Sequence, residues 1–243
     1  MMAGSELTIL TYNIYNHHEG ENAFAHRQQL VMETISSVAA DVVCLQEAPS
    51  TAFLRALVDY LSRRQERHLR LACAEMRRTD GWREHIAVIH TGTARAATVH
   101  LSPTGESIGI SVAVASGQGV RIASVHLNPH DAELRRAQAA RLAGELGGEG
   151  ATVVAGDFNA TPGGRTLAAF EDSMRYLAPA DGVTSTFPTA MRADSGGAPG
   201  GVLDHILGHG VGIDDWGVAG DAPVSGRWPS DHLGVWARIR LDA

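Results

Sequence analysis

Two kinds of hydrophobic spacing alternate along the chain and predict its helices and strands. Apolar residues recur at helical spacing over 27–40, and again after Ser50, a residue suited to cap a helix, over 53–61. A third helix is predicted over 131–146, and a fourth at Thr161-Pro162, because proline is favoured in the first turn of a helix. Short apolar runs typical of strands lie at Leu7–Ile14, Val42–Gln46, His85–His90, Ala97–Leu101, Ile108–Ala115, Val120–Leu127, Thr152–Ala155 and Leu233–Leu241.

The order of these elements indicates an α/β fold. Strand–helix–strand units come first, a run of strands occupies the middle, and strands return near the C-terminal end. Such an order predicts mixed sheets with helices on their outer faces. No repeat and no linker interrupts the pattern, and 243 residues suit one domain of the larger sandwich type. We therefore expect a single domain over residues 1–243.

Composition narrows the functional classes. All 20 basic residues are arginine, so a Schiff-base lysine and a phosphate-loop lysine are excluded. The net charge of −7 argues against a protein that coats nucleic acid, because phosphate binding draws on clustered cations. A nuclease is not excluded, since a bound divalent cation supplies positive charge locally.

The cysteines and the apolar runs suggest where the protein works. Cys44 and Cys73 have no CxxC spacing and are too few for a disulfide framework, which favours a reducing compartment. No signal peptide is visible, and no run approaches the ~18 apolar residues of a membrane span. We expect a cytoplasmic monomer that does not span a membrane.

The residues with most chemical content are polar and stand where apolar runs begin or finish. Each has a simple alternative role, such as capping a turn or starting a helix. Together they are costly to bury without a function, because buried polar groups need partners. They are Asn13, Glu47, His126, Asp157, Asn159, Asp204, Asp231 and His232.

Six short motifs around these residues resemble the endonuclease/exonuclease/phosphatase superfamily, which includes deoxyribonuclease-like enzymes and phosphatases. They occur in the family order, cover nearly the whole chain, and GDFN and SDH are the most specific of them. The resemblance implies a four-layer α/β/β/α sandwich of two mixed β-sheets flanked by helices. The motifs are Thr11-Tyr12-Asn13-Ile14, Leu45-Gln46-Glu47, His126-Leu127, Gly156-Asp157-Phe158-Asn159, Leu203-Asp204-His205-Ile206 and Ser230-Asp231-His232.

The resemblance also implies hydrolysis of a phosphoester with Mg²⁺, for which Mn²⁺ is an alternative. Hard cations prefer oxygen ligands, so the metal ligands expected are Asn13, Glu47 and Asp231. Zinc is disfavoured because the twelve histidines show no HExxH or paired Cys/His spacing.

The catalytic residues implied by the resemblance are His126, Asp157, Asn159, Asp204 and His232. Asp157 would position and activate the attacking water, with Asn159 orienting or ligating. His232, paired with Asp204, would contact the scissile phosphate or transfer a proton. His126 would donate to a phosphate oxygen or to the leaving group.

Some positions stay open at the level of sequence. Some nucleases of the family carry Asp two residues after the motif Asn, where this chain has Tyr15, and a solvated loop is the simpler interpretation of His17 and His18. Arg135 would reach the active site or brace it, and Trp228 would form a pocket wall or close the sheet end.

The substrate is less well defined than the reaction. A run of arginines over 55–83 would bind phosphate or, as we favour, form a solvated helix face. Aromatic residues make up 5% of the chain, with no row for stacking bases. A small or medium phosphomonoester or phosphodiester is therefore favoured over DNA or RNA, which is the alternative, and a binding module without activity ranks third.

Overall fold

The computed structural model covers the whole chain, and the placement of most residues is described. The described residues are 6–18, 20, 23–77, 83–92, 96–101, 110–115, 119–146, 150–179, 182–187 and 200–241.

Two six-stranded sheets pack face to face, with helices on both outer sides. The helices are α1 (Phe24–Val38), α2 (Thr51–Gln65) and α3 (Ala132–Leu146), with a 3₁₀ turn at Leu167–Phe170. The strands are β1 (Glu6–Asn13), β2 (Val42–Ala48), β3 (Arg70–Arg77), β4 (Arg83–His90), β5 (Ala96–His100), β6 (Ile110–Ala115), β7 (Arg121–His126), β8 (Thr152–Asp157), β9 (Arg175–Ala178), β10 (Asp204–His209), β11 (Val211–Ala219) and β12 (Gly234–Leu241).

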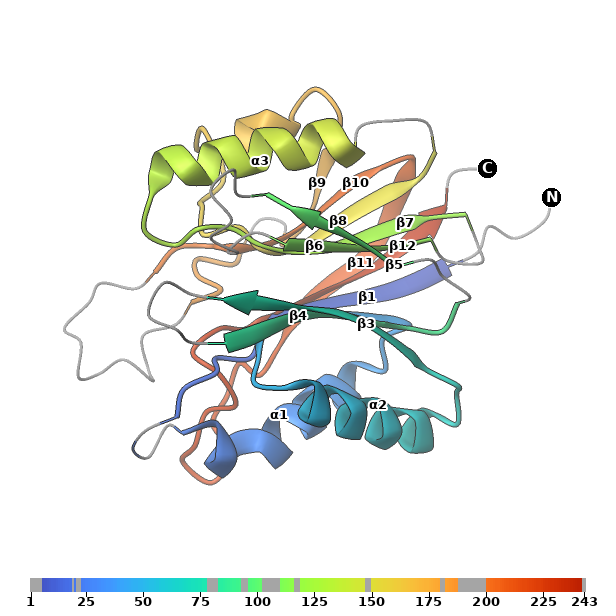
Figure 1. Cartoon of the computed structure of the whole chain (residues 1–243). Helices are drawn as coiled ribbons and strands as arrows, with labels where there is room; N and C mark the ends of the chain where they lie inside the picture. Colours follow the sequence, from blue (N-terminus) through green and yellow to red (C-terminus); the bar gives the residue numbers. More distant parts are fainter. Residues whose placement is uncertain are drawn as a thin grey trace.

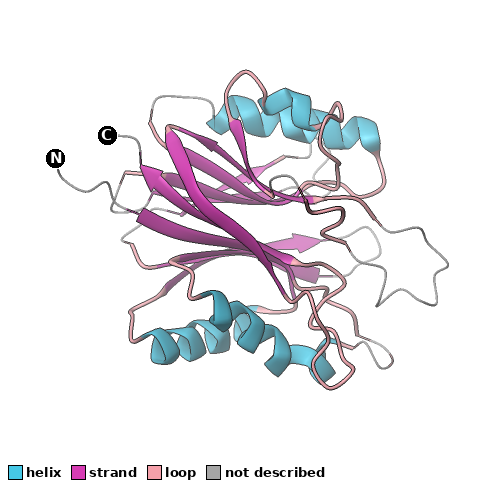
Figure 2. Cartoon of the chain, turned by 180° about the vertical axis from the view of Figure 1, so that it is seen from behind, coloured by secondary structure: helices cyan, strands magenta, loops and turns pink. Residues whose placement is uncertain are grey.

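The layers follow the predicted order of helix, sheet, sheet and helix. The first sheet has the order β11-β12-β1-β2-β4-β3, and the second β5-β6-β7-β8-β10-β9. Helices α1 and α2 cover the outer face of the first sheet, and α3 covers the second (Figures 1 and 2). Both sheets are mixed, since β1 with β2 and β7 with β8 run parallel while their other pairings are antiparallel. The predicted fold class is confirmed.

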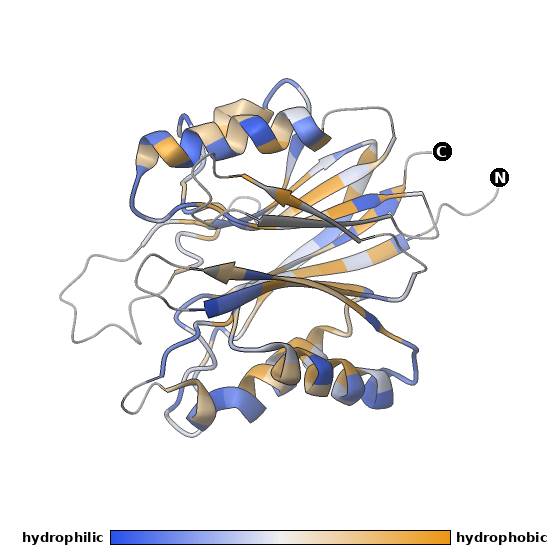
Figure 3. Ribbon diagram, in the orientation of Figure 1, coloured by the Kyte–Doolittle hydropathy of each residue, from blue (hydrophilic) through white to orange (hydrophobic). Residues whose placement is uncertain are grey.

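Three apolar layers hold the sandwich together. Alternate residues of the strands face either the partner sheet or the helices, so that Ile9 packs between the sheets and Leu10 packs under α1 and α2. A third layer lies between the second sheet and α3, where Leu142 is fully buried. Figure 3 shows the apolar residues along the strands and on the sheet-facing sides of the helices.

A buried polar bridge crosses the apolar layer between the sheets. Gln46 of β2 donates from Nε2 to Ser124 Oγ of β7 at 3.0 Å and to Thr11 Oγ1 of β1 at 3.2 Å. All three side chains are fully buried. The bridge ties the two sheets together one residue before Glu47 and two residues before His126.

Most predicted elements are present, with shifted ends. The Ser50 hydroxyl caps α2 by accepting from Phe53 N at 3.1 Å, and the exposed arginines Arg63, Arg64 and Arg67 form the solvated surface that we favoured. The prediction of a helix beginning at Thr161-Pro162 is wrong. Gly163 there has a φ of +74°, which favours a turn, and the chain forms only the 3₁₀ turn further on.

Strand direction brings the polar residues to one edge of each sheet. The parallel strands β1 and β2 end there, whereas β4 and β12 begin there because they run antiparallel to β2 and β1. In the second sheet β7 and β8 end at this edge and β10 begins there. Residues at the ends of seven strands are thus gathered although they are far apart in sequence. None of the helices within the described ranges is long and apolar enough to cross a membrane.

Candidate active site

Asp157 lies at the centre of the predicted site residues. Its Oδ2 accepts from Asn13 Nδ2 at 3.1 Å, and it lies 3.6 Å from His126 Nε2 and 3.7 Å from His232 Nε2. Its Oδ1 accepts from the backbone N of Asn159 at 2.8 Å, and the residue is 1% exposed. Four residues predicted from separate motifs therefore surround one buried carboxylate.

The glycine before Asp157 is required by close packing. A Cβ at Gly156 would stand 1.9 Å from the carbonyl oxygen of Val125, on the neighbouring parallel strand β7. Only glycine fits there, which explains the first letter of the GDFN motif. The close approach of β7 and β8 also brings His126 opposite Asp157 in register.

Asp204 and His232 form a buried pair beside Asp157. His232 Nδ1 lies 2.9 Å from Asp204 Oδ2. Burial disfavours the charged imidazole, but the negative charges of Asp204, Asp157 and Asp231 outweigh it and raise the pKa of His232 from 6.5 to about 10. At neutral pH His232 is therefore an imidazolium, with Nδ1–H donated to Asp204 and Nε2–H on the side of Asp157.

Glu47 stands in a bulge at the end of β2. The pairing of β2 with β4 shifts between Leu45 and Ala48, and Glu47 has a φ of +57°, unusual for a residue other than glycine. Its Oε1 accepts from Asn13 Nδ2 at 3.0 Å and its Oε2 from Asn16 N at 3.2 Å. The bulge places this carboxylate at the edge beside Asn13.

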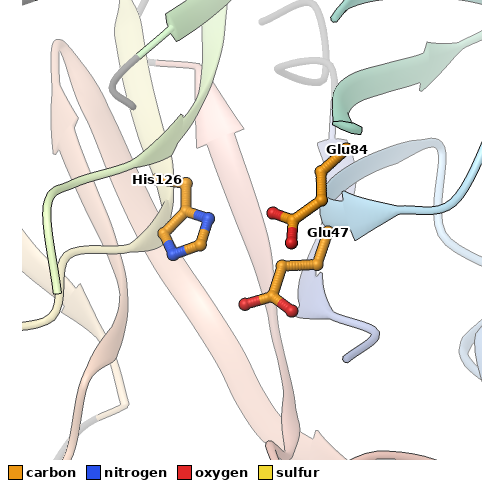
Figure 4. A group of neighbouring side chains, drawn as sticks. All are labelled: Glu47, Glu84 and His126. Carbon is orange, nitrogen blue, oxygen red and sulfur yellow. The ribbon is translucent and has the colours of Figure 1, made fainter. Parts of the chain in front are cut away.

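Glu84 belongs to the same group of side chains and was missed in the sequence. It is the second residue of β4 and only 2% exposed. Figure 4 shows its carboxylate beside that of Glu47, both pointing toward His126. Polar residues at strand ends were the available signal, but Glu84 precedes an apolar run, and only the antiparallel pairing with β2 brings it to the active edge.

Glu47, Glu84 and His126 have the chemistry of a metal site. One potential ligand atom of each lies within 4.8 Å of the others. Two carboxylates at this distance repel each other, which a divalent cation would relieve. His126 Nδ1 is buried and has no hydrogen-bond partner within the described ranges, so this ring nitrogen is available as a ligand or donor. The residues present therefore fit a divalent cation.

The other two expected ligands are placed differently. Asn13 uses Nδ2 on Glu47 and Asp157, while its Oδ1 accepts from Tyr15 N at 3.1 Å. Asp231 is 2% exposed and contributes negative charge at His232. The described residues form two groups of potential ligands, Glu47–Glu84–His126 and Asp157–Asp204–His232, and Asp231 is in neither. The two residues remain candidate ligands.

The loop after His126 is held by residues whose roles were open in the sequence. Arg135 donates from Nη1 to Asn128 O at 2.7 Å, and Gln138 Oε1 accepts from Asn128 N at 2.8 Å. Asn159 donates from Nδ2 to Leu127 O at 3.0 Å. Arg135 therefore braces this loop, and Asn159 connects the two loops that follow His126 and Asp157.

Arg27 joins two other segments of the site and was not singled out by sequence. It is 1% exposed and donates to the carbonyl oxygens of Ile14 at 2.9 Å, Pro229 at 2.6 Å, and Tyr15. The carbonyls lie after Asn13 and before Asp231, so one guanidinium ties both segments together. Nearby, His17 stacks on the Tyr15 ring at 5.2 Å, while His18 is exposed.

His205 supports the loop behind Asp157 and predicts a dependence of stability on pH. Its Nε2 donates to Ala160 O at 2.7 Å, and its Nδ1 accepts from the Tyr176 hydroxyl. Burial lowers the pKa of His205 from 6.5 to about 4. The neutral ring therefore contributes stability above pH 6.5, and this contribution is lost between pH 6.5 and 4, at a cost on the order of 3 kcal/mol.

The measurement is the free energy of unfolding by urea at pH 7, 5.5 and 4.5. The variant His205→Gln should be less stable at pH 7 and should lose less stability on acidification than the wild type. His209→Gln changes an exposed histidine of the same strand and is the matched control. An equal acid loss in wild type and His205→Gln would contradict this role.

The fold and the gathered carboxylates and imidazoles define a class: metal-dependent hydrolases that act on phosphoester bonds. The chain matches the sequence profile of the Endonuclease/Exonuclease/phosphatase family over residues 10–232, and it belongs to that family. The resemblance found in the motifs is thereby confirmed. A comparison with curated proteins gives no significant match.

Solved structures show the same fold at low sequence identity. A family member from Bacteroides vulgatus is 18% identical, with a TM-score of 0.73, and covers 98% of this chain and 99% of its own. Truncated TDP2 from Caenorhabditis elegans is 16% identical, with a TM-score of 0.71 and coverages of 98% and 99%. The mannosyl-6-phosphatase Bt3783 from Bacteroides thetaiotaomicron is 15% identical, with a TM-score of 0.71 and coverages of 96% and 99%.

Proposed function

We propose that this chain hydrolyses a small or medium phosphomonoester or phosphodiester by direct in-line attack of water. The observation that carries the proposal is the environment of Asp157, a buried carboxylate with two imidazole nitrogens at 3.6 and 3.7 Å. A carboxylate can orient and deprotonate a water molecule, and imidazole N–H groups can stabilise the negative charge on phosphoryl oxygens by hydrogen bonding.

Each residue has a role that its contacts support. Asp157 accepts the proton of the attacking water, and Asn13 holds the Asp157 carboxylate in place. The imidazolium of His232 donates Nε2–H to a phosphoryl oxygen, and His126 donates to a phosphoryl oxygen or to the leaving group. The backbone bond from Asn159 to Asp157 fixes the second carboxylate oxygen.

The cation we propose is Mg²⁺, with Mn²⁺ as a substitute. Glu47 and Glu84 would hold it, with Asn13 and Asp231 as further candidates, and oxygen donors are the ligands that Mg²⁺ prefers. When bound, it would neutralise charge on the phosphoryl oxygens.

A polymeric nucleic-acid substrate is the second candidate. The charge of −7 and the use of Arg27 and Arg135 for internal contacts argue for a small substrate. Trp228, half-buried three residues before Asp231, would form one wall of the substrate pocket. We further propose a monomer in a reducing cytoplasm, in agreement with the free Cys44 and Cys73.

The test is a panel of phosphoesters with Mg²⁺, Mn²⁺ and Zn²⁺. It should include sugar phosphates, nucleotides, lipid headgroup phosphates, small diesters, oligonucleotides and plasmid. We expect turnover of small esters that depends on Mg²⁺ or Mn²⁺ and changes little between about 50 and 200 mM salt, since few phosphates are contacted. Cleavage restricted to polymers, falling steeply with salt, would favour the nuclease instead. No hydrolysis with any metal would contradict the proposed function.

A further inference from the structure

Thr186 makes a set of buried hydrogen bonds that the proposed mechanism does not use. Its hydroxyl donates to Asp204 Oδ2 at 2.7 Å and accepts from the backbone N of Leu203 at 2.9 Å and of Asp204 at 3.0 Å. Thr186 and Asp204 are both fully buried. One hydroxyl therefore holds the backbone and the carboxylate of Asp204 at once.

Thr186 is also connected to the segment that carries His232. Its carbonyl oxygen accepts from Leu233 N at 2.7 Å. The next residue, Phe187, packs its ring against the His232 imidazole, with centroids 4.6 Å apart. The segment 186–187 thus contacts both members of the Asp204–His232 pair, Asp204 through the Thr186 hydroxyl and His232 through the Phe187 ring. The Thr186 carbonyl also holds Leu233, the residue after His232.

The Asp204 carboxylate depends on Thr186 for its orientation. Its Oδ2 receives two side-chain donors, the Thr186 hydroxyl and His232 Nδ1 at 2.9 Å. Its Oδ1 is buried and has no hydrogen-bond partner among the described residues. Without the hydroxyl, Oδ2 would keep His232 Nδ1 as its one side-chain donor, and the carboxylate could turn about its Cβ–Cγ bond, which would misalign its hydrogen bond to His232. With the hydroxyl in place, Oδ2 is fixed between two donors.

We propose that Thr186 is a positioning residue, which fixes the Asp204 carboxylate so that His232 presents Nε2–H to the phosphoryl group. The proposal rests on the proposed function for its kinetic consequence only. Two hydrogen bonds connect the Thr186 hydroxyl to the Asp204 carboxylate and that carboxylate to the His232 imidazole. They extend from a buried loop to the centre of the site. Thr186 itself does not touch the substrate.

The first experiment compares Thr186→Val with Thr186→Ser. Valine keeps the shape and removes the hydroxyl, whereas serine keeps the hydroxyl. A hydrogen bond to a charged group implies a fall in kcat of about 10- to 100-fold for Thr186→Val, with KM nearly unchanged. Thr186→Ser should restore kcat to within about three-fold of wild type.

Ser185→Ala is the matched control. Ser185 Oγ accepts from Phe187 N at 3.1 Å and donates to Gly200 O, so this change weakens the same loop without touching Asp204. We expect it to lower the midpoint of thermal unfolding and to leave kcat close to wild type. Equal losses of kcat in Ser185→Ala and Thr186→Val would mean that loop stability is the cause, and would overturn the proposal.

A second experiment reads the Asp204–His232 bond without any substrate. The Nδ1 proton of His232 should give a downfield proton NMR signal, assigned by its absence in His232→Ala. The signal should shift or broaden in Thr186→Val and return in Thr186→Ser. Thr186→Cys, with a weak thiol donor, replaces the valine variant if that does not fold. An unchanged signal in the variant that lacks the hydroxyl would overturn the proposal.

A kinetic double-mutant cycle tests whether Thr186 acts through Asp204. In the background of Asp204→Asn, adding Thr186→Val should change kcat by less than about two-fold. Fully multiplicative effects would show that Thr186 acts on its own, against the proposal. If the wild type hydrolyses no phosphoester, the proposed function fails, while the NMR comparison still decides the role of Thr186.

Discussion

Replacing Asp157 by asparagine is expected to lower kcat by about three orders of magnitude. The amide has nearly the shape of the carboxylate but cannot accept the proton of the attacking water. It also places neutral atoms between His126 and His232, whose nitrogens lie 3.6 and 3.7 Å from Asp157 Oδ2.

The measurement is kcat on the best substrate of the panel, with circular dichroism and thermal unfolding to verify the fold. Asp172→Asn is the matched control and should be fully active. Asp172 is exposed and lies in the turn before β9, in the sheet that also contains Asp157. KM should change little in Asp157→Asn, because the main loss is in the transition state. A decrease of kcat by less than about ten-fold would remove Asp157 from the role of base.

The second large effect is expected for the two carboxylates that face His126. Glu47→Gln and Glu84→Gln should each raise the concentration of Mg²⁺ or Mn²⁺ needed for half-maximal activity by about 10- to 100-fold. Each amide keeps the shape but removes one negative charge from a pair within 4.8 Å. High metal concentration should restore part of the lost activity.

Calorimetric titration with Mn²⁺ measures the same loss without a substrate. Glu145→Gln, on the exposed surface of α3, is the control and should bind Mn²⁺ as the wild type does. Asp231→Asn tests whether Asp231 is a ligand in addition to Glu47 and Glu84. It should weaken Mn²⁺ binding only if Asp231 contacts the cation. Unchanged binding in both Glu47→Gln and Glu84→Gln would place the cation elsewhere.

Local patterns predicted those parts of the fold and site that depend on neighbouring residues. Helices α1, α2 and α3 follow their apolar spacing, and Asp157 and His232 stand in short motifs that can be recognised without knowledge of the fold. The chain turns instead of forming a helix after Thr161, because Gly163 adopts a backbone conformation that a helix does not allow.

Residues whose roles depend on distant pairing could not be found in this way. Glu84 reaches the site only because β4 runs antiparallel to β2, and no local pattern states that direction. Thr186 stands 18 residues before its partner Asp204, and Arg27 bonds to a carbonyl 202 residues away. Long-range contacts of this kind leave no periodicity in the sequence.

The buried bridge from Gln46 to Ser124 has a consequence for how the catalytic geometry is protected. An apolar layer tolerates a small shift of one sheet relative to the other, since one methyl group packs about as well as another. A buried amide does not tolerate such a shift, because it needs a specific hydrogen-bond partner. A shift of one sheet past the other would break the hydrogen bond from Gln46 to Ser124, at a cost of about 1–3 kcal/mol. The carboxylates of Glu47 and Glu84, from the first sheet, and the imidazole of His126, from the second, therefore meet in one relative position of the sheets. A shifted packing that would separate them is disfavoured by a hydrogen bond within the core.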